Sequence, residues 1–280
     1  MIDVRAGDHT ATAIHGVEEF AANTAPFARS ALTAGAEVMV IPTDEGRGAL
    51  DAYLDRDATL RDAVRAGRIR VGLPEQARGV DGTFDPNRLR RVYAEATRRA
   101  VGGGHSGLWV SVDMGETVTR HVEPATLVAF ESGSFPLFSS AELTAMCQYD
   151  LRTFPAEVIL AARRAHPRNG RVRLRHEHVG GHSWRLSGET DLANRTAWDA
   201  LVDAIPDGDD VDITAMVFMD AHAVRRLALV AMDRPGMTVI GTEAHARLLR
   251  LAGLARRACS VQVSSADAGT DRGRELEEPA

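Results

Sequence analysis

Several residues that could bind a small ligand follow the strands expected in the first half of the chain. Asp113 directly follows an apolar run, Glu116 lies three residues further on, and Tyr149 and Asp150 end a second apolar run. In an open sheet of parallel strands, ligands bind at the carboxyl ends of the strands. These four residues are therefore candidate ligand-binding residues. The alternative for each acid is a solvated loop position or a helix cap.

A second candidate site is the start of a helix in the last third of the chain. Residues 211–213 are typical of a buried strand, and Met216 to Met219 of an apolar loop. Asp220 follows as a helix cap, because its carboxylate can accept hydrogen bonds from the free N–H groups of the first turn. These donors and the positive end of the helix dipole favour an anionic group or a docked partner. Phe218 and the two methionines would add apolar contact area there, or lie buried under the sheet.

Metal chemistry has weaker support in the sequence. His176 and His178 share one face of an expected strand, and His182 lies across a glycine turn, so three imidazoles could approach one ion. No spacing of Cys or carboxylate residues supports such a site, and the polar face of an edge hairpin is the preferred interpretation. Cys147 lies in the middle of an expected strand and is interpreted as a core residue. We therefore predict no metal site.

Nucleotide hydrolysis also lacks its motif. A P-loop requires a strand, then G-x-x-x-x-G-K-[ST], then a helix, and no such string occurs. The glycine-rich residues 102–107 lie between a helix and a strand, which is the wrong order. We predict no bound cofactor and no enzymatic activity.

The elements that must position these residues alternate between strands and helices, which predicts an α/β fold with a parallel sheet. We expect strands over 9–14, 37–41, 69–72, 108–113 and 143–149, and helices over 17–32, 59–66, 86–101, 124–131 and 154–165. After an interdomain linker over 166–170 the pattern restarts, with strands over 171–177, 183–187, 209–213 and 237–241 and helices over 194–204, 221–232 and 244–252. We predict domains at 1–167 and 168–263 and a disordered tail at 264–280.

The first domain carries a family resemblance. Its motifs are Glu18–Phe20 with Phe27 and Gly35, Phe84–Pro86, Asp113–Met114, and Cys147–Asp150 ahead of Phe154–Pro155. From about His9 to Pro167 the chain resembles the MEDS domain, a DcmR-type sensory domain of methanogens and methylotrophs. The resemblance implies a ligand sensor with a RecA-like or Rossmann-like, mostly parallel sheet and helices on both faces. It adds the leading His9, and Glu131 on the helix 124–131, to the ligand candidates. The Cys typical of the family after that His is absent.

The second domain resembles another family through three motifs in order. They are L-S-G-E-T-D-L-A-N over 186–194, Phe218–Asp220, and L-L-R-L-A-G-L over 248–254. The resemblance is to the STAS domain of bacterial anti-sigma factor antagonists, and it implies a smaller αβ domain. It places the partner-binding face at Asp191, Asn194, Met219, Asp220, Ala221, His222 and Arg225. In switchable antagonists a Ser follows the central Asp and a kinase phosphorylates it. Ala221 takes its place here, so we expect no phosphorylation site.

Composition is that of an ordinary globular protein. The 280 residues are 44% hydrophobic and 26% charged, and the net charge of −6 argues against nucleic acid as a direct partner. No apolar run approaches the roughly 20 residues that span a bilayer, and the N-terminus lacks a signal pattern. Cys147 and Cys259 fall in different predicted domains, so we expect no disulfide and a cytoplasmic location.

These observations predict a non-enzymatic signalling regulator of transcription. A ligand bound by the MEDS-like domain would control access of an anti-sigma factor, or a related kinase-like regulator, to the STAS-like domain. Two alternatives stay open. One is a RecA-like domain that retains nucleotide binding or hydrolysis. The other is a scaffold whose STAS-like half only mediates oligomerisation, for example as a homodimer.

Overall fold

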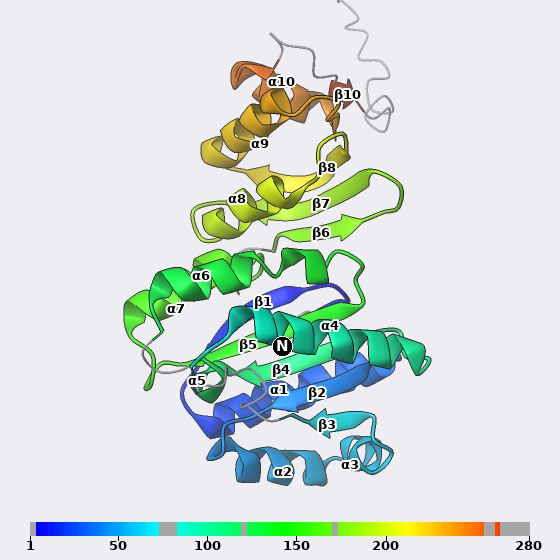
Figure 1. Cartoon of the computed structure of the whole chain (residues 1–280), viewed down its shortest axis with the longest axis vertical. Coiled ribbons are helices and arrows are strands. Elements are labelled where there is room, and N and C mark those ends of the chain that lie inside the picture. The colour runs from blue at the N-terminus through cyan, green and yellow to red at the C-terminus, as the bar shows by residue number, and fades with distance from the viewer. Residues whose placement is uncertain (1–3, 73–82, 119–121, 170–172, 255–260, 264–280) are drawn as a thin grey trace, which may run out of the picture.

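The computed structural model describes residues 4–72, 83–118, 122–169, 173–254 and 261–263. This part of the chain forms two five-stranded sheets that follow one another along the long axis of the molecule (Figure 1). The first has the order β1-β5-β4-β2-β3 and is entirely parallel. The second has the order β10-β9-β8-β7-β6, in which only the β6–β7 pair is antiparallel. The predicted α/β class, with a parallel sheet flanked by helices and a second sheet in the C-terminal part, is confirmed.

Strands and helices alternate through the first domain as predicted. They are β1 (His9–Ile14), α1 (Val17–Thr33), β2 (Glu37–Ile41), α2 (Gly46–Arg56), α3 (Ala58–Arg65), β3 (Ile69–Val71), α4 (Pro86–Gly102), β4 (Leu108–Asp113), α5 (Met114–Thr117), α6 (Pro124–Ser132), the 3-10 turn η2 (Phe135–Leu137), β5 (Leu143–Asp150) and α7 (Ala156–Ala165). Helix α2 was not predicted. It buries only Leu50 and Leu54 as large apolar side chains, so its helical period is weak.

The continuous apolar strands follow from a sheet that is covered on both faces. Every residue of β2, β4 and β5 is buried. Helices α1, α2 and α3 supply the core on one face, and α4, α6 and α7 supply the core on the other. A parallel sheet between two helical layers leaves no solvated face, which is why polar alternation is absent from these strands.

The second domain begins with an antiparallel hairpin and continues as a parallel sheet. Its elements are β6 (Arg175–His178), β7 (Ser183–Thr190), α8 (Arg195–Ala204), β8 (Asp210–Met219), α9 (Ala221–Asp233), β9 (Val239–Gly241), α10 (Glu243–Leu251) and β10 (Val261–Val263). The predicted apolar loop over 216–219 is wrong, because β8 continues to Met219. Met216 is buried and Phe218 is 52% exposed. The predicted tail, residues 264–280, lies outside the described residues.

The two sheets are joined through the backbone of Arg168, within the predicted linker, and of Arg173, just after it. The N–H of Ala11 in β1 donates to the carbonyl of Arg168 at 2.9 Å, and the N–H of Glu189 in β7 donates to the carbonyl of Arg173 at 3.3 Å. Arg168 and Arg173 form an isolated antiparallel bridge with one another. The segment that leaves the first domain is therefore held between the two sheets, and the side chains of residues 166–169 are buried.

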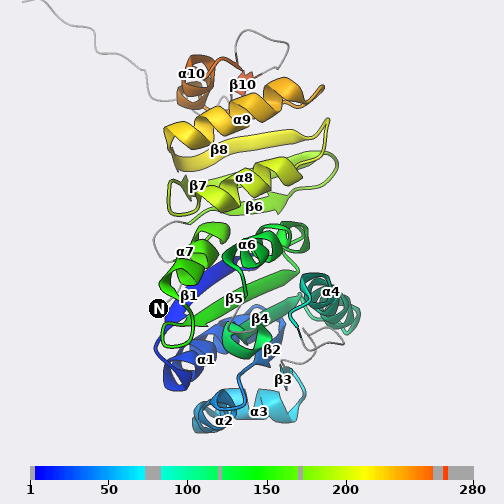
Figure 2. The ribbon, with the colours of Figure 1, turned by 60° about the vertical axis from the view of Figure 1, so that its left-hand side comes forward.

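Charged side chains reinforce this connection. The carboxylate of Asp8, which is 2% exposed, pairs with the guanidinium groups of Arg168 and Arg175, the latter at 2.8 Å. Asp8 precedes β1, and Arg175 begins β6. Figure 2 shows α6 and α7 between the first sheet and the second domain, where both contact α8.

The His176 imidazole in β6 also lies in this region. Its ring packs edge-on against Phe135 of η2 and is stacked with Trp184 of β7. Its Nε2 lies 3.4 Å from the Phe135 carbonyl oxygen. The side chain is buried, unlike that of His178 two residues later.

Burial of His176 should make folding stability depend on pH. Desolvation lowers the pKa of His176 to about 4, although the Phe135 carbonyl partly opposes the shift. An unfolded histidine titrates near about 6.5, so between the two values the unfolded chain binds the extra proton. The contribution of His176 to the free energy of unfolding should therefore fall by about 3 kcal/mol as the pH drops from about 6.5 to about 4, and then level off.

Denaturant unfolding at a series of pH values measures this contribution as the difference between the wild type and His176→Phe. The variant should show a shallower loss of stability below pH about 6.5, because it no longer buries a neutral imidazole. His178→Phe changes an exposed histidine of the same strand and should keep the wild-type profile. Equal profiles for all three proteins would contradict the prediction.

No helix in the described part of the chain is both long enough and apolar enough to cross a membrane.

Candidate functional site

Four buried side chains with metal-ligating atoms meet inside the first domain. They are His9 at the start of β1, Glu131 near the end of α6, Cys147 in β5 and His166 directly after α7. One ligand atom of each lies within 4.8 Å of the others. None of the four side chains is more than 3% exposed. We call these four residues the buried cluster.

Strand pairing and helix packing bring the buried cluster together. In the parallel register, Ala11 of β1 lies opposite Cys147 of β5. His9 lies two residues before Ala11, so its side chain is on the same face of the sheet as Cys147. Helices α6 and α7 pack against one another over this face. Pro167 cannot continue α7, and His166 is its C-terminal cap.

The atoms of the buried cluster are close but poorly connected by hydrogen bonds. Glu131 Oε2 lies 3.2 Å from His9 Nε2 and 3.4 Å from His166 Nε2. Cys147 Sγ lies 3.7 Å from His9 Nε2. Among the described residues, neither Glu131 Oε2 nor His166 Nε2 makes a hydrogen bond. Buried polar atoms nearly always have a partner, so two orphaned atoms facing one another require an explanation.

The outward-facing atoms of Glu131 and His166 are hydrogen-bonded, whereas His9 Nδ1 has no hydrogen-bond partner among the described residues. The Tyr149 hydroxyl donates to Glu131 Oε1 at 2.5 Å. His166 Nδ1 lies 2.7 Å from the carbonyl oxygen of Ala162, which can only accept, so this nitrogen carries the proton. The His9 ring is stacked on Phe138 with centroids 4.3 Å apart. The surrounding groups therefore fix the orientation of three members of the buried cluster.

Burial sets the ionisation of the cluster. Desolvation lowers the pKa of His166 to about 4, with the charge of Glu131 opposing it, so the imidazole is neutral at pH 7. Burial, with the charge of Glu131, raises the pKa of the Cys147 thiol well above its usual range. The same two causes raise the pKa of the Tyr149 phenol, which remains a donor. A buried thiol of high pKa is a poor nucleophile, so the arrangement suits binding rather than covalent chemistry.

The structure brings together three of the six predicted ligand residues, namely His9, Glu131 and Tyr149. Asp113 instead caps α5 by accepting from the N–H of Gly115 at 2.8 Å. Asp150 pairs with Arg152 at 2.6 Å and is held ionised there. Both acids lie at the carboxyl ends of their strands, but their carboxylates are already occupied by neighbouring groups. Glu116 lies in α5, and its side chain is outside the described residues.

Sequence reasoning did not assign His166 and Cys147 to a site. His166 falls in the segment interpreted as a linker, although it is fully buried. Cys147 is a core residue as predicted, but its neighbours are His9 and Glu131 rather than apolar groups alone. The available signal was one His at the start of a predicted strand, one His directly after a predicted helix, and a Cys inside a predicted strand. Without the β1–β5 pairing, the sequence could not show that they converge.

The three histidines considered as a possible metal site from the sequence have separate surroundings in the described structure. His176 is buried against aromatic rings, His178 is exposed, and His182 Nδ1 lies 2.8 Å from Asp209. His178 and His182 lie on the polar outer face of the hairpin as predicted, whereas the side chain of His176 is buried.

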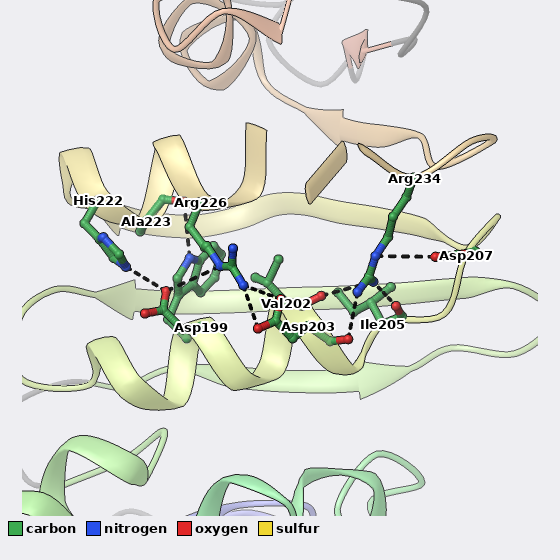
Figure 3. A network of polar contacts seen from close by, with 10 residues as sticks. Asp199, Val202, Asp203, Ile205, Asp207, His222, Ala223, Arg226 and Arg234 are labelled. Atoms are coloured by element: carbon green, nitrogen blue, oxygen red, sulfur yellow. Dashed lines mark hydrogen bonds and ion pairs between the residues drawn. The ribbon is translucent and has the colours of Figure 1, made fainter. Parts of the chain in front are cut away.

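The start of α9 is capped as predicted. The Asp220 carboxylate accepts from the N–H of Ala223 at 2.8 Å, and Ala221 is exposed. His222 Nε2 lies 2.6 Å from Asp199 of α8, and Arg226 pairs with Asp203 at 2.6 Å (Figure 3). These pairs fix the first turns of α9 to α8.

The other predicted partner-binding residues divide into exposed and enclosed positions. Arg225 is exposed, whereas Met219 and Asp191 are partly buried. Asn194 is completely buried, so its side chain cannot contact a partner as predicted. The same end of the domain exposes Leu192, Val217 and Phe218, of which Val217 is 78% exposed. These exposed apolar side chains are candidate contacts for a partner.

The fold and the buried cluster define the class of this protein: it contains an α/β domain with an enclosed polar site between sheet and helices. Residues 8–167 match the family model "MEDS: MEthanogen/methylotroph, DcmR Sensory domain". This chain belongs to the MEDS family, and its first domain is a sensory domain.

Comparisons with curated proteins and with solved structures do not extend this assignment. No curated protein matches the chain. Among solved structures, the chain is similar to the flagellar accessory protein FlaH from Methanocaldococcus jannaschii, with a TM-score of 0.39 and 10% sequence identity. The similarity covers 69% of this chain and 82% of that one. At this TM-score the likeness supports no conclusion about fold or function.

Proposed function

We propose that this protein is a non-enzymatic signalling regulator of the anti-sigma factor antagonist type. In this proposal the occupancy of the buried cluster in the MEDS domain controls partner binding by the C-terminal, STAS-like domain. One observation carries it. A short series of hydrogen bonds connects the segment at His166 with Asp220 at the start of α9.

The first step of the series is a buried asparagine. Asn194 Nδ2 donates to the carbonyl of Pro167 at 3.2 Å and to the carbonyl of Glu189 at 3.1 Å. Its Oδ1 accepts from the N–H of Asp191 at 2.9 Å. Pro167 directly follows His166. A movement of His166 would therefore reach the end of β7 through one side chain.

The second step is a backbone contact. The N–H of Asp220 donates to the carbonyl of Thr190, the last residue of β7, at 3.1 Å. Asp220 is the cap of α9, and its position sets the first turn of that helix. Rearrangement at the end of β7 would thus alter both the α9 start and the exposed residues Val217 and Phe218 directly before it. A short chain of packed groups of this kind can couple two sites if it has two arrangements.

Two features of the α9 start support a partner there. Phe218 and Val217 expose large apolar side chains directly before Asp220. Ala221 has no hydroxyl group, so covalent phosphorylation at this position cannot control the surface. In this proposal the first domain controls partner access to this surface. That role fits the domain order, in which a sensory domain is followed by a partner-binding domain.

Affinity capture with the full chain tests the proposal. The wild type should recover a kinase-like anti-sigma factor from an extract of its own cells, and Phe218→Asp should recover at least tenfold less. Leu248→Asp is the matched control, because Leu248 is 42% exposed on α10 of the same domain. Capture of no such protein, or equal capture by Phe218→Asp and Leu248→Asp, would contradict the proposal.

Asn194→Ala tests the coupling itself. The wild type should capture different amounts of partner with micromolar zinc, the ion proposed for the buried cluster in the next subsection, and with a chelator. In Asn194→Ala the two amounts should become equal, because the connection from Pro167 to β7 is broken. An unchanged difference in this variant, with circular dichroism like that of the wild type, would show that the signal takes another route.

A further inference from the structure

We propose that His9, Glu131, Cys147 and His166 together bind one divalent metal ion of the zinc class. This inference deepens the proposed function, because it names the chemical class of the group that occupies the sensing site. Metal binding itself can be measured without any partner. Only the expected consequence of binding, control of the second domain, rests on the proposed function.

The spacing of the donor atoms matches one small ion. Zinc bonds of about 2.0–2.3 Å in a tetrahedral site place the ligand atoms roughly 3.3–3.8 Å from one another. Three of the six separations are 3.2 Å for His9 Nε2 to Glu131 Oε2, 3.4 Å for His166 Nε2 to Glu131 Oε2, and 3.7 Å for Cys147 Sγ to His9 Nε2. The ligand atoms of all four residues lie within 4.8 Å of one another. Donor atoms this close leave room for a single atom and exclude an organic ligand between them.

The orphaned atoms point to a cation rather than to an internal hydrogen bond. His166 Nδ1 donates to the Ala162 carbonyl, so Nε2 is the ring nitrogen that faces Glu131 Oε2, 3.4 Å away. Neither of these two buried atoms makes a hydrogen bond among the described residues. A metal ion between them would satisfy both.

The groups behind two of the ligands, His166 and Glu131, are those that metal sites commonly use. A ligating histidine usually donates its other N–H to a carbonyl or carboxylate, as His166 does to Ala162. A ligating carboxylate is usually held by a further hydrogen bond, as Glu131 is by the Tyr149 hydroxyl. These contacts leave one lone pair of each side chain directed into the buried cluster.

The donor types select the metal class. Two imidazole nitrogens, one thiolate and one carboxylate suit zinc, whereas magnesium and calcium prefer sites made of oxygen ligands. The thiol of Cys147 would lose its proton on binding, and the thiolate with the Glu131 carboxylate would balance a charge of two. With four protein ligands the site is closed, as in structural and sensory zinc sites rather than catalytic ones.

Metal content of the untagged full chain is the first test. After purification with micromolar zinc and dialysis, the wild type should hold about one zinc per chain by mass spectrometry of the metal, as one four-ligand site requires. Cys147→Ser and His166→Gln should hold at least tenfold less. Cys259→Ser and His178→Gln are the matched controls, one for each ligand type, and should keep the wild-type content. No zinc in the folded wild type, or equal zinc in all five proteins, would overturn the inference.

Cobalt replacement gives a second readout that does not depend on a stable variant. The wild type and Cys259→Ser loaded with Co²⁺ should show a thiolate-to-cobalt charge-transfer band and the visible bands of a tetrahedral ion. Cys147→Ser should lose the charge-transfer band. Absence of the charge-transfer band from the wild type would overturn the inference.

The two proposals can fail separately. If no metal binds but Asn194→Ala still changes the response to some other ligand, the sensory proposal stands and the metal inference is wrong. If zinc binds as expected but partner capture never depends on it, the metal is structural and the proposed control is wrong.

Discussion

Glu131→Ala is expected to lower the free energy of unfolding of the metal-free protein by about 3–5 kcal/mol. The change leaves the buried Tyr149 hydroxyl without its acceptor, which costs about 1–3 kcal/mol. It also leaves a cavity where the side chain was completely enclosed, and truncations to alanine at such sites cost about 2 kcal/mol or more. Urea unfolding in the presence of a chelator measures the change without any contribution from a bound ion.

Two further variants identify the cause of this loss. Glu131→Gln keeps an acceptor for Tyr149 and nearly the same volume, so it should cost less than half as much as Glu131→Ala. Glu123→Ala removes the same charge from an exposed position at the start of the same helix, and it should change stability by no more than about 0.5 kcal/mol. If Glu131→Ala were as mild as Glu123→Ala, the carboxylate would not hold the buried cluster together.

Gly188→Ala is expected to break the contact between the end of β7 and the segment that leaves the first domain. Gly188 has a φ of 93°, and a Cβ built there would overlap the backbone oxygen of Arg173. Alanine in this backbone region costs about 1–2 kcal/mol, and overpacking costs about 1–3 kcal/mol more. The displaced backbone is the one in which the Glu189 N–H donates to Arg173. We therefore expect both lower stability and loss of communication with the first domain.

Gly180→Ala separates these two causes. Gly180 has a φ of 94°, but a Cβ there would meet nothing within 4 Å. Gly180→Ala should lose only the stability that a positive φ costs an alanine. It should therefore be more stable than Gly188→Ala by about 1–3 kcal/mol. Hydrogen exchange should show faster exchange at the Glu189 and Asp220 amides in Gly188→Ala only. Equal stability and equal exchange in the two variants would mean that the contact between Gly188 and Arg173 contributes neither to stability nor to the protection of these amides.

Local sequence determined the elements of the first domain. Continuous apolar runs predicted β2, β4 and β5, because strands of a parallel sheet are covered on both faces. Asp85, with Pro86 after it, predicted the start of α4, and the Asp85 carboxylate caps the helix as expected. Helix α2 was missed because so few of its residues contact the core. The end of β8 was misjudged because Val217 and Phe218 are apolar but exposed, which pattern alone cannot show.

The candidate site depended on more than local pattern. The motifs of the family led to His9 and Glu131, and the strand end led to Tyr149. These three residues meet, whereas Asp113 and Asp150, selected by the same strand-end reasoning, have neighbouring partners instead. Asn194 was expected on a partner-binding face, but the structure encloses it between the domains.

By itself, the sequence determined the α/β class, the MEDS family and the capped start of α9 at Asp220, because these depend on periodicity, spacing and local hydrogen bonding. Only the tertiary structure decided that His9 and Cys147 are neighbours, because strand order β1-β5-β4-β2-β3 places the first strand beside the last. It also decided that His166 is a buried ligand candidate rather than part of a linker. Both facts come from contacts between residues more than 130 positions apart or across packed helices, which no local pattern encodes.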